Sequence, residues 1–98
     1  MITLKIKWIR KAASNFDDEY DWLYLESPQV ATEFAREVFR LVSLLVTNPA
    51  LGRAGRVMGT REIVMQTFPY LIPYRVKSNE IHILRIFHMR RRPPKGGW

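Results

Sequence analysis

The sequence predicts an α+β domain in which an antiparallel pair of helices packs on one face of a mainly antiparallel sheet. Three observations lead to this: an alternating apolar segment near the N-terminus, two segments with apolar residues at spacings of three and four, and three strand-like runs near the C-terminus. The 98 residues, of which 47% are hydrophobic, suffice for one modest core. We therefore expect a single domain over residues 1–98, with a basic C-terminal tail from about residue 89.

The chain is expected to open with a strand and a helix. Ile2, Leu4 and Ile6 alternate with polar residues, which is typical of a half-exposed strand, and Trp8 closes it. A helix with an apolar stripe over residues 9–24 follows. Its acidic residues are expected to form a solvated face: Asp17, Asp18, Glu19 and Asp21.

Ser27-Pro28 predicts the start of a second helix. A serine oxygen can accept a hydrogen bond from the first turn, and proline at the first helical position loses no needed donor. An apolar stripe over residues 31–45 indicates the buried face of this helix, and Asn48-Pro49 is expected to end it. The short connection predicts that the two helices pack as an antiparallel hairpin.

The remainder is expected to form a loop and three strands. The glycine-rich, basic residues 48–61 lack the spacing of a phosphate-binding loop. "REIVMQT", "YLIPYRVK" and "EIHILRIF" are predicted strands, with a tight turn at Ser78-Asn79. Pro73 lacks an N–H and should mark a bulge or an unpaired position. We expect the sheet face opposite the helices to be free and the tail to extend from it.

Charge is distributed unevenly along the chain. Residues 1–52 contain six lysines and arginines against seven acidic residues, whereas residues 53–98 contain ten against two. The second half therefore forms a basic surface that attracts nucleic acid or an acidic protein, and the charge alone does not choose between them. A charged surface that only keeps the protein soluble is the alternative.

Composition excludes several kinds of site. No segment has the roughly 20 apolar residues that a membrane span needs, and the N-terminal segment lacks the apolar core of a signal peptide. The chain has no cysteine, and two histidines six residues apart on a strand are a poor metal pair. We expect a cytoplasmic protein with no metal, no cofactor and no contact with a membrane.

The order and spacing of these segments resemble the type II toxins of the RelE/ParE superfamily, and most closely its ParE branch. The resemblance covers nearly the whole chain, including "SPQVATEFAREV", "NPALGR", "GTREI", "PYLIPYRV" and "IHILRIFHMRR". It implies a cognate antitoxin that wraps the toxin in a hetero-oligomer and neutralises it. It also implies one of two targets, because ParE-type members poison DNA gyrase whereas RelE-type members cleave messenger RNA in the ribosome.

The sequence lacks two parts that the ribonuclease branch would need. Metal-free RNA cleavage requires a base, an acid and cations close together. In that branch an arginine commonly follows the aromatic residue of the middle strand, and a tyrosine often lies near the C-terminus. Here Leu71 occupies the arginine position and no tyrosine follows Tyr74. The resemblance therefore favours a gyrase poison; a ribosome-dependent ribonuclease, a toxin-like fold without toxicity and another target are the alternatives.

The candidate site residues are mostly arginines of the second half. For a gyrase poison we expect no catalytic residue, and contacts with the target from Arg53, Arg56, Arg61, Arg75, Arg90, Arg91 and Arg92. The last three are expected to be exposed and to contribute little to folding. For an enzyme, which would be a metal-independent endoribonuclease, the candidate catalytic residues are Arg61, Arg75 and His88.

Three side chains of the last predicted strand have alternative roles. His88 could order the strand end through a backbone hydrogen bond instead of transferring protons. His82 has the strand parity of His88 but lies between two isoleucines, so we expect it to be structural. Arg85 has the opposite parity and either pairs with Glu62 or faces the open side of the sheet.

Overall fold

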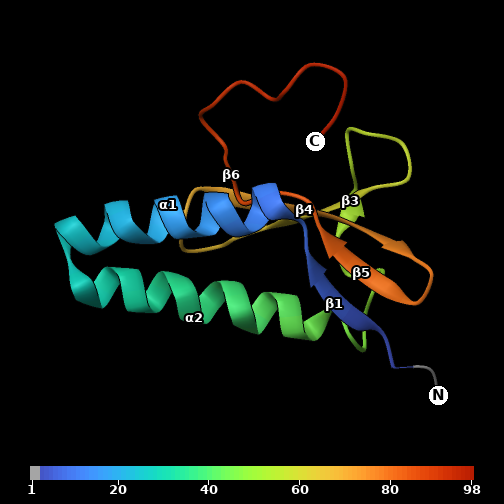
Figure 1. The fold of residues 1–98 in the computed structure, drawn as a ribbon, viewed down its shortest axis with the longest axis horizontal. Coiled ribbons are helices and arrows are strands. Elements are labelled where there is room, and N and C mark those ends of the chain that lie inside the picture. Colours follow the sequence, from blue (N-terminus) through green and yellow to red (C-terminus); the bar gives the residue numbers. More distant parts are fainter. Residues whose placement is uncertain (1–2) are drawn as a thin grey trace.

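The computed structural model describes residues 3–98 and has the predicted α+β architecture (Figure 1). Its elements are, in chain order, β1 (Lys5–Trp8), α1 (Arg10–Glu26), α2 (Pro28–Leu44), β2 (Arg53–Ala54), β3 (Arg61–Val64), β4 (Tyr70–Lys77), β5 (Glu80–Ile83) and β6 (Phe87–His88). Ile2, which the alternation assigns to the first strand, lies outside the described residues. Between residues 3 and 98 no helix is long and apolar enough to cross a membrane.

The strands form one sheet in the order β1-β5-β4-β3-β2, and β6 pairs with β4 beyond the end of β5. β1 is parallel to β5, and the other pairs are antiparallel. The predicted tight turn between β4 and β5 is confirmed. Ser78 and Asn79 have φ angles of 53° and 61°, the positive values that a type I′ turn requires.

The two helices run side by side in opposite directions and cover one face of the sheet (Figure 1). Only Ser27 separates them; its Oγ accepts a 3.3 Å hydrogen bond from the Val30 N–H, and Pro28 is the first residue of α2. α2 ends at Leu44, before the predicted end at Asn48. There the Thr47 hydroxyl donates to the Leu44 carbonyl (3.4 Å), a local bond of the kind that competes with helix continuation.

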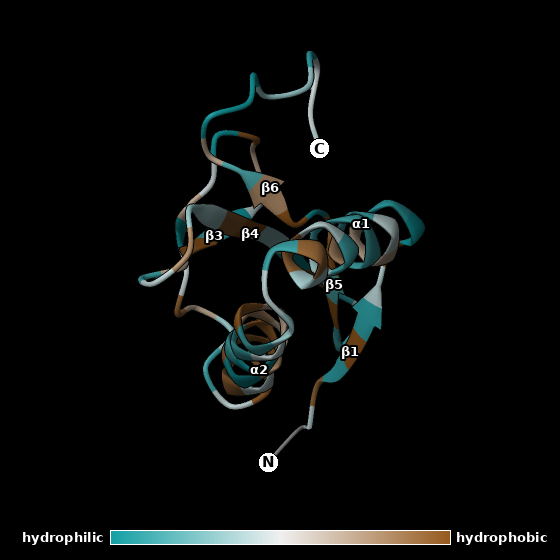
Figure 2. Cartoon of the chain, turned by 90° about the vertical axis from the view of Figure 1, so that its left-hand side faces the viewer, coloured by the Kyte–Doolittle hydropathy of each residue, from teal (hydrophilic) through white to brown (hydrophobic). Residues whose placement is uncertain are grey.

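The core lies between the helices and the central strands of the sheet (Figure 2). Tyr70, Ile72 and Tyr74 project from β4 into this core, where Phe34 and Val38 of α2 are fully buried. Burial of a large apolar side chain stabilises the fold by about 1.5–3 kcal/mol. This packing holds one end of β4 opposite α1, where the candidate site lies.

A bulge separates β5 from β6. Tyr74 pairs with Ile83, and Leu71 pairs with Phe87. Between these two pairs, the segment from Ile83 to Phe87 contains one residue more than the segment of β4 that it faces. The bulge lies beside Pro73, whose carbonyl accepts a 2.9 Å hydrogen bond from the Leu84 N–H and which has no N–H to return. Pro73 therefore marks a bulge, as predicted.

The bulge also changes which side chains share a face. One extra residue inverts the alternation, so His82 lies on the face away from the helices and His88 on the face toward them. The expectation that the two histidines share a parity was therefore wrong. They also lie at opposite ends of β4, since His88 pairs with Tyr70 and His82 pairs with Arg75.

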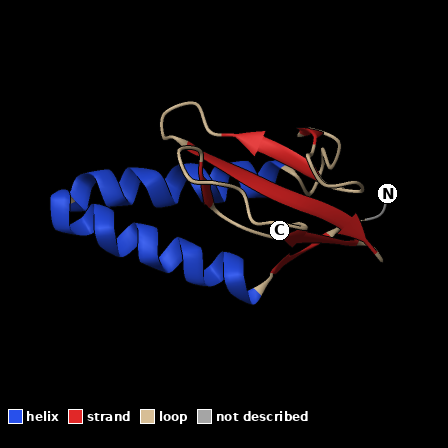
Figure 3. Cartoon of the chain, turned by 90° about the horizontal axis from the view of Figure 1, so that it is seen from above, coloured by secondary structure: helices blue, strands red, loops and turns tan. Residues whose placement is uncertain are grey.

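The sheet face away from the helices is covered in part, contrary to expectation. Leu71 and Phe87 are buried there, and the Trp98 ring lies 5.3 Å from the Phe87 ring between centroids. Arg85 Nε donates a 2.7 Å hydrogen bond to the Trp98 carbonyl, and the Arg56 guanidinium lies 5.0 Å from the Trp98 ring centroid. The tail thus returns to the sheet instead of extending away from it (Figure 3).

Candidate functional site

Glu62 of β3 gathers two of the arginines predicted to bind the target. Its side chain is 3% exposed and contacts Arg53 (3.3 Å) and Arg56 (3.4 Å), and the Arg56 N–H also donates to Oε2 (2.9 Å). Arg53 reaches Glu62 because the segment expected to be a loop contains β2, which pairs with β3. Arg85 does not pair with Glu62; of its two alternatives, the face away from the helices is observed, where Trp98 accepts its hydrogen bond.

Arg61 braces the loop between α2 and β2. Its guanidinium donates a 2.8 Å hydrogen bond to the Gly52 carbonyl. Beside it, the Tyr74 hydroxyl donates to the Pro49 carbonyl (2.7 Å) and accepts from the Gly52 N–H (2.8 Å). Burial raises the pKa of Tyr74, which keeps this hydroxyl protonated. Arg61 therefore uses part of its donors for the fold.

Arg75 has a similar internal role on the other face. Its Nε donates to His82 Nδ1 (3.2 Å), and His82 Nε2 lies 3.1 Å from Glu80 Oε1. The hydrogen bond to His82 lowers the pKa of Glu80, and nearby Lys7 and Lys5 act in the same direction. His82 is 8% exposed, and these contacts agree with the structural role expected for it.

The structure does not bring the three candidate ribonuclease residues together. His88 pairs with Tyr70, and Arg75 lies five residues further along β4, which is about 16 Å at the rise of a strand. Arg75 also points to the opposite face, toward His82. Leu71, at the position of the ribonuclease arginine, is 1% exposed and is paired with Val64 and Phe87 of the neighbouring strands.

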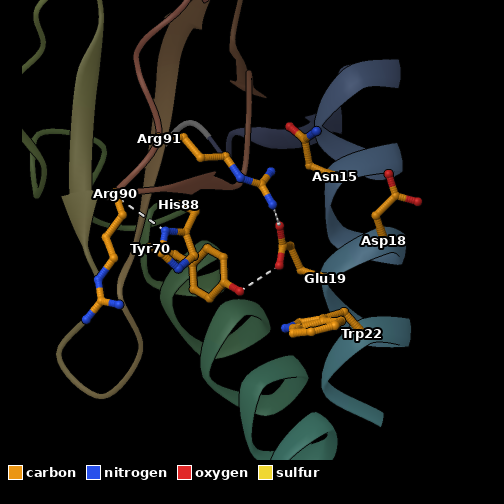
Figure 4. A pocket seen from close by; sticks show the side chains of 8 residues that line it. All are labelled: Asn15, Asp18, Glu19, Trp22, Tyr70, His88, Arg90 and Arg91. Carbon is orange, nitrogen blue, oxygen red and sulfur yellow. Dashed lines mark hydrogen bonds and ion pairs between the residues drawn. The ribbon is translucent and has the colours of Figure 1, made fainter. Parts of the chain in front are cut away.

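A cleft of about 540 Å³ lies instead between α1 and the sheet end formed by β4 and β6 (Figure 4). One wall is a single face of α1, because residues three or four positions apart lie on the same side of a helix. Its members are Asn15, Asp18, Glu19 and Trp22. The opposite wall consists of Tyr70, His88, Arg90 and Arg91. The cleft therefore unites two predicted target-binding arginines with His88, which makes it the candidate functional site.

Glu19 links the two walls of the cleft. It is 6% exposed, and its Oε2 accepts a 2.7 Å hydrogen bond from the Tyr70 hydroxyl while Oε1 lies 3.1 Å from Arg91 (Figure 4). Its predicted place on a solvated helix face was wrong, because this side of α1 packs against the sheet end. Burial, and then the hydrogen bond to Glu19, raises the pKa of Tyr70, so Tyr70 is a neutral donor at physiological pH.

His88 lies beside this pair. The Arg90 N–H donates to His88 Nδ1 (3.1 Å), which is the backbone hydrogen bond of the alternative role considered above. This bond assigns the proton of the neutral ring to Nε2. The His88 ring meets the Tyr70 ring at 82° with centroids 5.1 Å apart. The aromatic contact and the backbone bond together hold the imidazole in one orientation.

The three C-terminal arginines differ from one another. Arg91 is exposed, as expected, but it pairs with the buried Glu19 (3.1 Å), so its contribution to folding is tested below by substitution. Arg90 and Arg92 are exposed and form no ion pair with any residue of the described chain. These two guanidinium groups are available to an external anion.

The chemistry of the cleft is that of a binding site for a polar ligand. Both Glu19 oxygens are engaged, and Asn15 Oδ1 accepts from the Ile86 N–H (3.4 Å). This leaves the arginines, His88 Nε2, the Asn15 amide and the Trp22 indole as donors and the Asp18 carboxylate as an acceptor. Within residues 3–98 no group of three or more His, Asp or Glu side chains could hold a metal ion.

Five members of this site were not predicted from the sequence: Asn15, Asp18, Glu19, Trp22 and Tyr70. The sequence of α1 contains a signal for three of them. Asn15, Glu19 and Trp22 are four and seven residues apart, which places an amide, a carboxylate and an indole on one helix face. No local pattern connects them to Tyr70, which is 51 residues from Glu19. The partner became visible only in the folded chain.

Comparisons with known proteins are consistent in both sequence and structure. The family "ParE toxin of type II toxin-antitoxin system, parDE" matches residues 6–93. "Putative toxin Y4kP" of Sinorhizobium fredii is 32% identical over 91 residues, which are 93% of this chain and 94% of the relative. The structure "Chromosomal ParDE TA system from P. aeruginosa" superposes with a TM-score of 0.79 at 34% identity, over 92% of this chain and 100% of that chain.

Proposed function

Because this chain belongs to the ParE toxin family of type II toxin-antitoxin systems, we propose that it poisons DNA gyrase and that a cognate antitoxin neutralises it. Gyrase acts in the cytoplasm, so the toxin would act there. On this proposal the protein binds gyrase, DNA or both and holds the cleaved complex, which blocks replication. It carries out no reaction of its own and needs no cofactor.

The separation of the ribonuclease candidates is the observation that carries this proposal. RNA cleavage needs its base, acid and cations around one phosphate. His88 and Arg75 lie on opposite faces and about 16 Å apart along β4, and buried Leu71 replaces a further cation. A protein that only binds its target needs no such convergence, because separate arginines can contact separate parts of a large partner.

The groups beside His88 also favour binding over catalysis. Tyr70 stays protonated at neutral pH because its pKa is raised, so it cannot serve as a base, and Glu19 has both oxygens engaged. Among the three ribonuclease candidates, His88 is the group suited to proton transfer, and one imidazole cannot act as base and acid in the same step. A RelE-type ribonuclease acting on ribosome-bound messenger RNA is the alternative, and the assays below distinguish the two.

The basic surface supports contact with gyrase and its DNA. Seven arginines are the candidates: Arg53, Arg56, Arg61, Arg75, Arg90, Arg91 and Arg92. Five of them have internal partners that fix their position, whereas Arg90 and Arg92 have no ion pair inside the described chain. Arg90 and Arg92 are therefore the best residues with which to test target binding.

An antitoxin has an apolar surface to cover. Leu25 at the tip of the helical hairpin is 83% exposed, and Phe39 is 49% exposed beside a groove of about 270 Å³ that Trp8 and Phe16 also line. An amphipathic antitoxin segment could place its apolar side there and its acidic side toward the arginines. The structurally similar relative from P. aeruginosa is a ParDE system, which supports an antitoxin of the ParD kind in a hetero-oligomer.

The target is tested with purified protein in two parallel assays. We expect inhibition of gyrase supercoiling, or trapped cleaved DNA, and intact messenger RNA in a translating extract. Arg90→Ala with Arg92→Ala should reduce gyrase inhibition, more at low than at high salt, without lowering Tm. Lys11→Ala with Arg36→Ala, two exposed cations of the helices, is the matched control. Site-specific cuts in ribosome-bound RNA with unaffected gyrase would establish the ribonuclease instead.

The antitoxin is tested by co-expression. The protein encoded beside this gene should relieve growth inhibition and co-purify with the toxin. Leu25→Ser with Phe39→Ser should weaken that complex, because the exposed apolar contacts are removed while the core is untouched. Unchanged toxicity in the presence of every neighbouring gene product would contradict the proposed neutralisation.

A further inference from the structure

The cleft between α1 and β6 has the size and the chemistry of a ligand site. Its volume of about 540 Å³ lies within the range of roughly 300–1,000 Å³ that small-molecule sites occupy. The sheet side contributes Arg90, Arg91 and His88, whereas the α1 side contributes Asp18 and Trp22 (Figure 4). A ligand that satisfies both sides must be anionic at one end and donate hydrogen bonds at the other.

The sheet side is suited to a phosphate. One nitrogen of the Arg91 guanidinium contacts Glu19, and the Arg91 side chain as a whole is 67% exposed. Its other N–H groups are therefore available to a ligand. Arg90 has no internal ion pair among the described residues, and its side chain is long enough to turn toward an incoming anion. His88 adds an Nε2–H, since Nδ1 accepts from the Arg90 backbone. Arginine N–H groups bind phosphate oxygens in strong, charge-assisted hydrogen bonds.

The helix side is suited to a planar base with donors on its edge. Trp22 is 58% exposed, so the indole presents a face on which a base can stack. Asp18 lies one helical turn before Trp22, and its exposed carboxylate forms no ion pair within residues 3–98. A carboxylate accepts two parallel hydrogen bonds only from a group that presents two adjacent donors.

We propose that this cleft binds a single guanine nucleotide of a nucleic acid. The phosphate is held by Arg90, Arg91 and His88, the base stacks on Trp22, and the guanine N1–H and N2–H₂ groups donate to Asp18. Guanine is the base that places a ring N–H next to an amino group, whereas in adenine and cytosine the amino group adjoins a ring acceptor. The Glu19–Tyr70–Arg91 link positions the two walls and does not itself contact the base.

Binding is measured by NMR titration of the ¹⁵N-labelled protein with dGMP and, separately, with dTMP. The three indole N–H signals are assigned with Trp22→Phe, Trp8→Phe and Trp98→Phe variants. We expect dGMP to shift the Trp22 indole signal and dTMP to shift it far less at equal concentration. The Trp8 and Trp98 signals should stay in place, because neither residue lines this cleft. Equal responses to the two nucleotides, or no response of Trp22, would overturn the proposal.

Two matched variants test the assigned contacts. Asp18→Asn should reduce dGMP affinity to that of dTMP, while Asp17→Asn should leave the preference intact, because Asp17 lines the groove on the other side of α1. Trp22→Ala should weaken dGMP binding by about five- to 150-fold, the range for loss of one stacked base. Asp17 and Asp18 are exposed, so their substitutions should leave Tm unchanged. Identical effects of Asp17→Asn and Asp18→Asn would refute the role of Asp18.

The source of the nucleotide is distinguished with oligonucleotides that contain one guanine in a run of thymidine or uridine. The assignment of this nucleotide to DNA rests on the proposed function, since gyrase is bound to DNA. Binding of the DNA oligonucleotide and loss of gyrase inhibition in Asp18→Asn would support both proposals. Binding of the RNA oligonucleotide alone would support the cleft and contradict the gyrase target. If neither dGMP nor either oligonucleotide binds, the proposed nucleotide site in the cleft is wrong. The result of the gyrase assay would not be affected by that outcome.

Discussion

Replacing Tyr70 by phenylalanine should destabilise the protein through the loss of one oxygen atom. The ring contacts with Phe34 (5.2 Å between centroids) and His88 (5.1 Å) are retained, whereas Glu19 loses its 2.7 Å hydrogen bond. A hydrogen bond to a charged group contributes about 1.5–3 kcal/mol. Glu19 is 6% exposed, so water cannot easily replace the lost donor. We therefore expect the free energy of unfolding to fall by about 2 kcal/mol, which lowers Tm by roughly 8–16 °C.

The assay is urea unfolding followed by circular dichroism, arranged as a double-mutant cycle. Glu19→Met retains the approximate shape of the side chain and removes the acceptor. If the bond between Tyr70 and Glu19 is the cause, Tyr70→Phe should cost at least about 1 kcal/mol less in the Glu19→Met background. Tyr20→Phe is the matched control, because the Tyr20 hydroxyl makes no hydrogen bond within the described part of the chain, and its effect should stay within about 0.5 kcal/mol.

Two results would refute this reasoning. If Tyr70→Phe unfolded at the same urea concentration as Tyr20→Phe, the hydroxyl would contribute nothing at this site. An equally large cost with and without Glu19 would show that the destabilisation has another origin, such as a shift of the β4 ring against the core. Either result would also remove the physical reason for regarding Glu19 as the link between the two walls of the cleft.

Three further predictions follow from neighbouring contacts. Arg91→Ala should lower the free energy of unfolding by about 1 kcal/mol, because it leaves the buried Glu19 with one partner, whereas Arg92→Ala should leave it unchanged in urea unfolding. The raised pKa of Tyr70 stabilises the protein fully below the ordinary tyrosine pKa of about 10, and this stabilisation is lost as pH rises toward the folded-state pKa. The urea concentration at the unfolding midpoint should therefore fall above about pH 10, and it should fall less steeply in Tyr70→Phe. Gly52→Ala should lower Tm by an amount equivalent to about 1–3 kcal/mol, because a Cβ would lie 2.7 Å from the Tyr74 ring and 2.9 Å from the Glu62 carbonyl, whereas Met58→Ala, at a 98% exposed side chain, should not change it.

Local physical rules explain why much of the fold could be predicted. The serine–proline start of α2 and the positive-φ turn at Ser78-Asn79 each depend on residues that are adjacent in the chain, and the irregularity at Pro73 depends on the missing N–H of that one residue. The apolar periods of the helices and strands then determine which faces are buried. The order of elements and the helical hairpin were accordingly confirmed.

The errors have a common cause in long-range pairing. The return of Trp98 to the sheet, and with it the contact of Arg85, depends on a tail whose sequence has no apolar period. Strand parity predicts a shared face for His82 and His88 only if the strand is regular, and the bulge beside Pro73 inverts the alternation between them. A residue type can predict that a bulge occurs, but not which of its neighbours change face.

The sequence by itself determined the class of fold, the family and the uneven charge, because each of these is a property of pattern or composition. Only the tertiary structure decided which charged groups face one another. Glu19 belongs to an acidic run and Tyr70 to an apolar strand, and 51 residues separate them in the chain. Their contact, and the pairing of Arg91 with the same carboxylate, exist because α1 packs against one end of β4. Burial then makes each of these polar contacts necessary, since a buried carboxylate without partners would destabilise the fold.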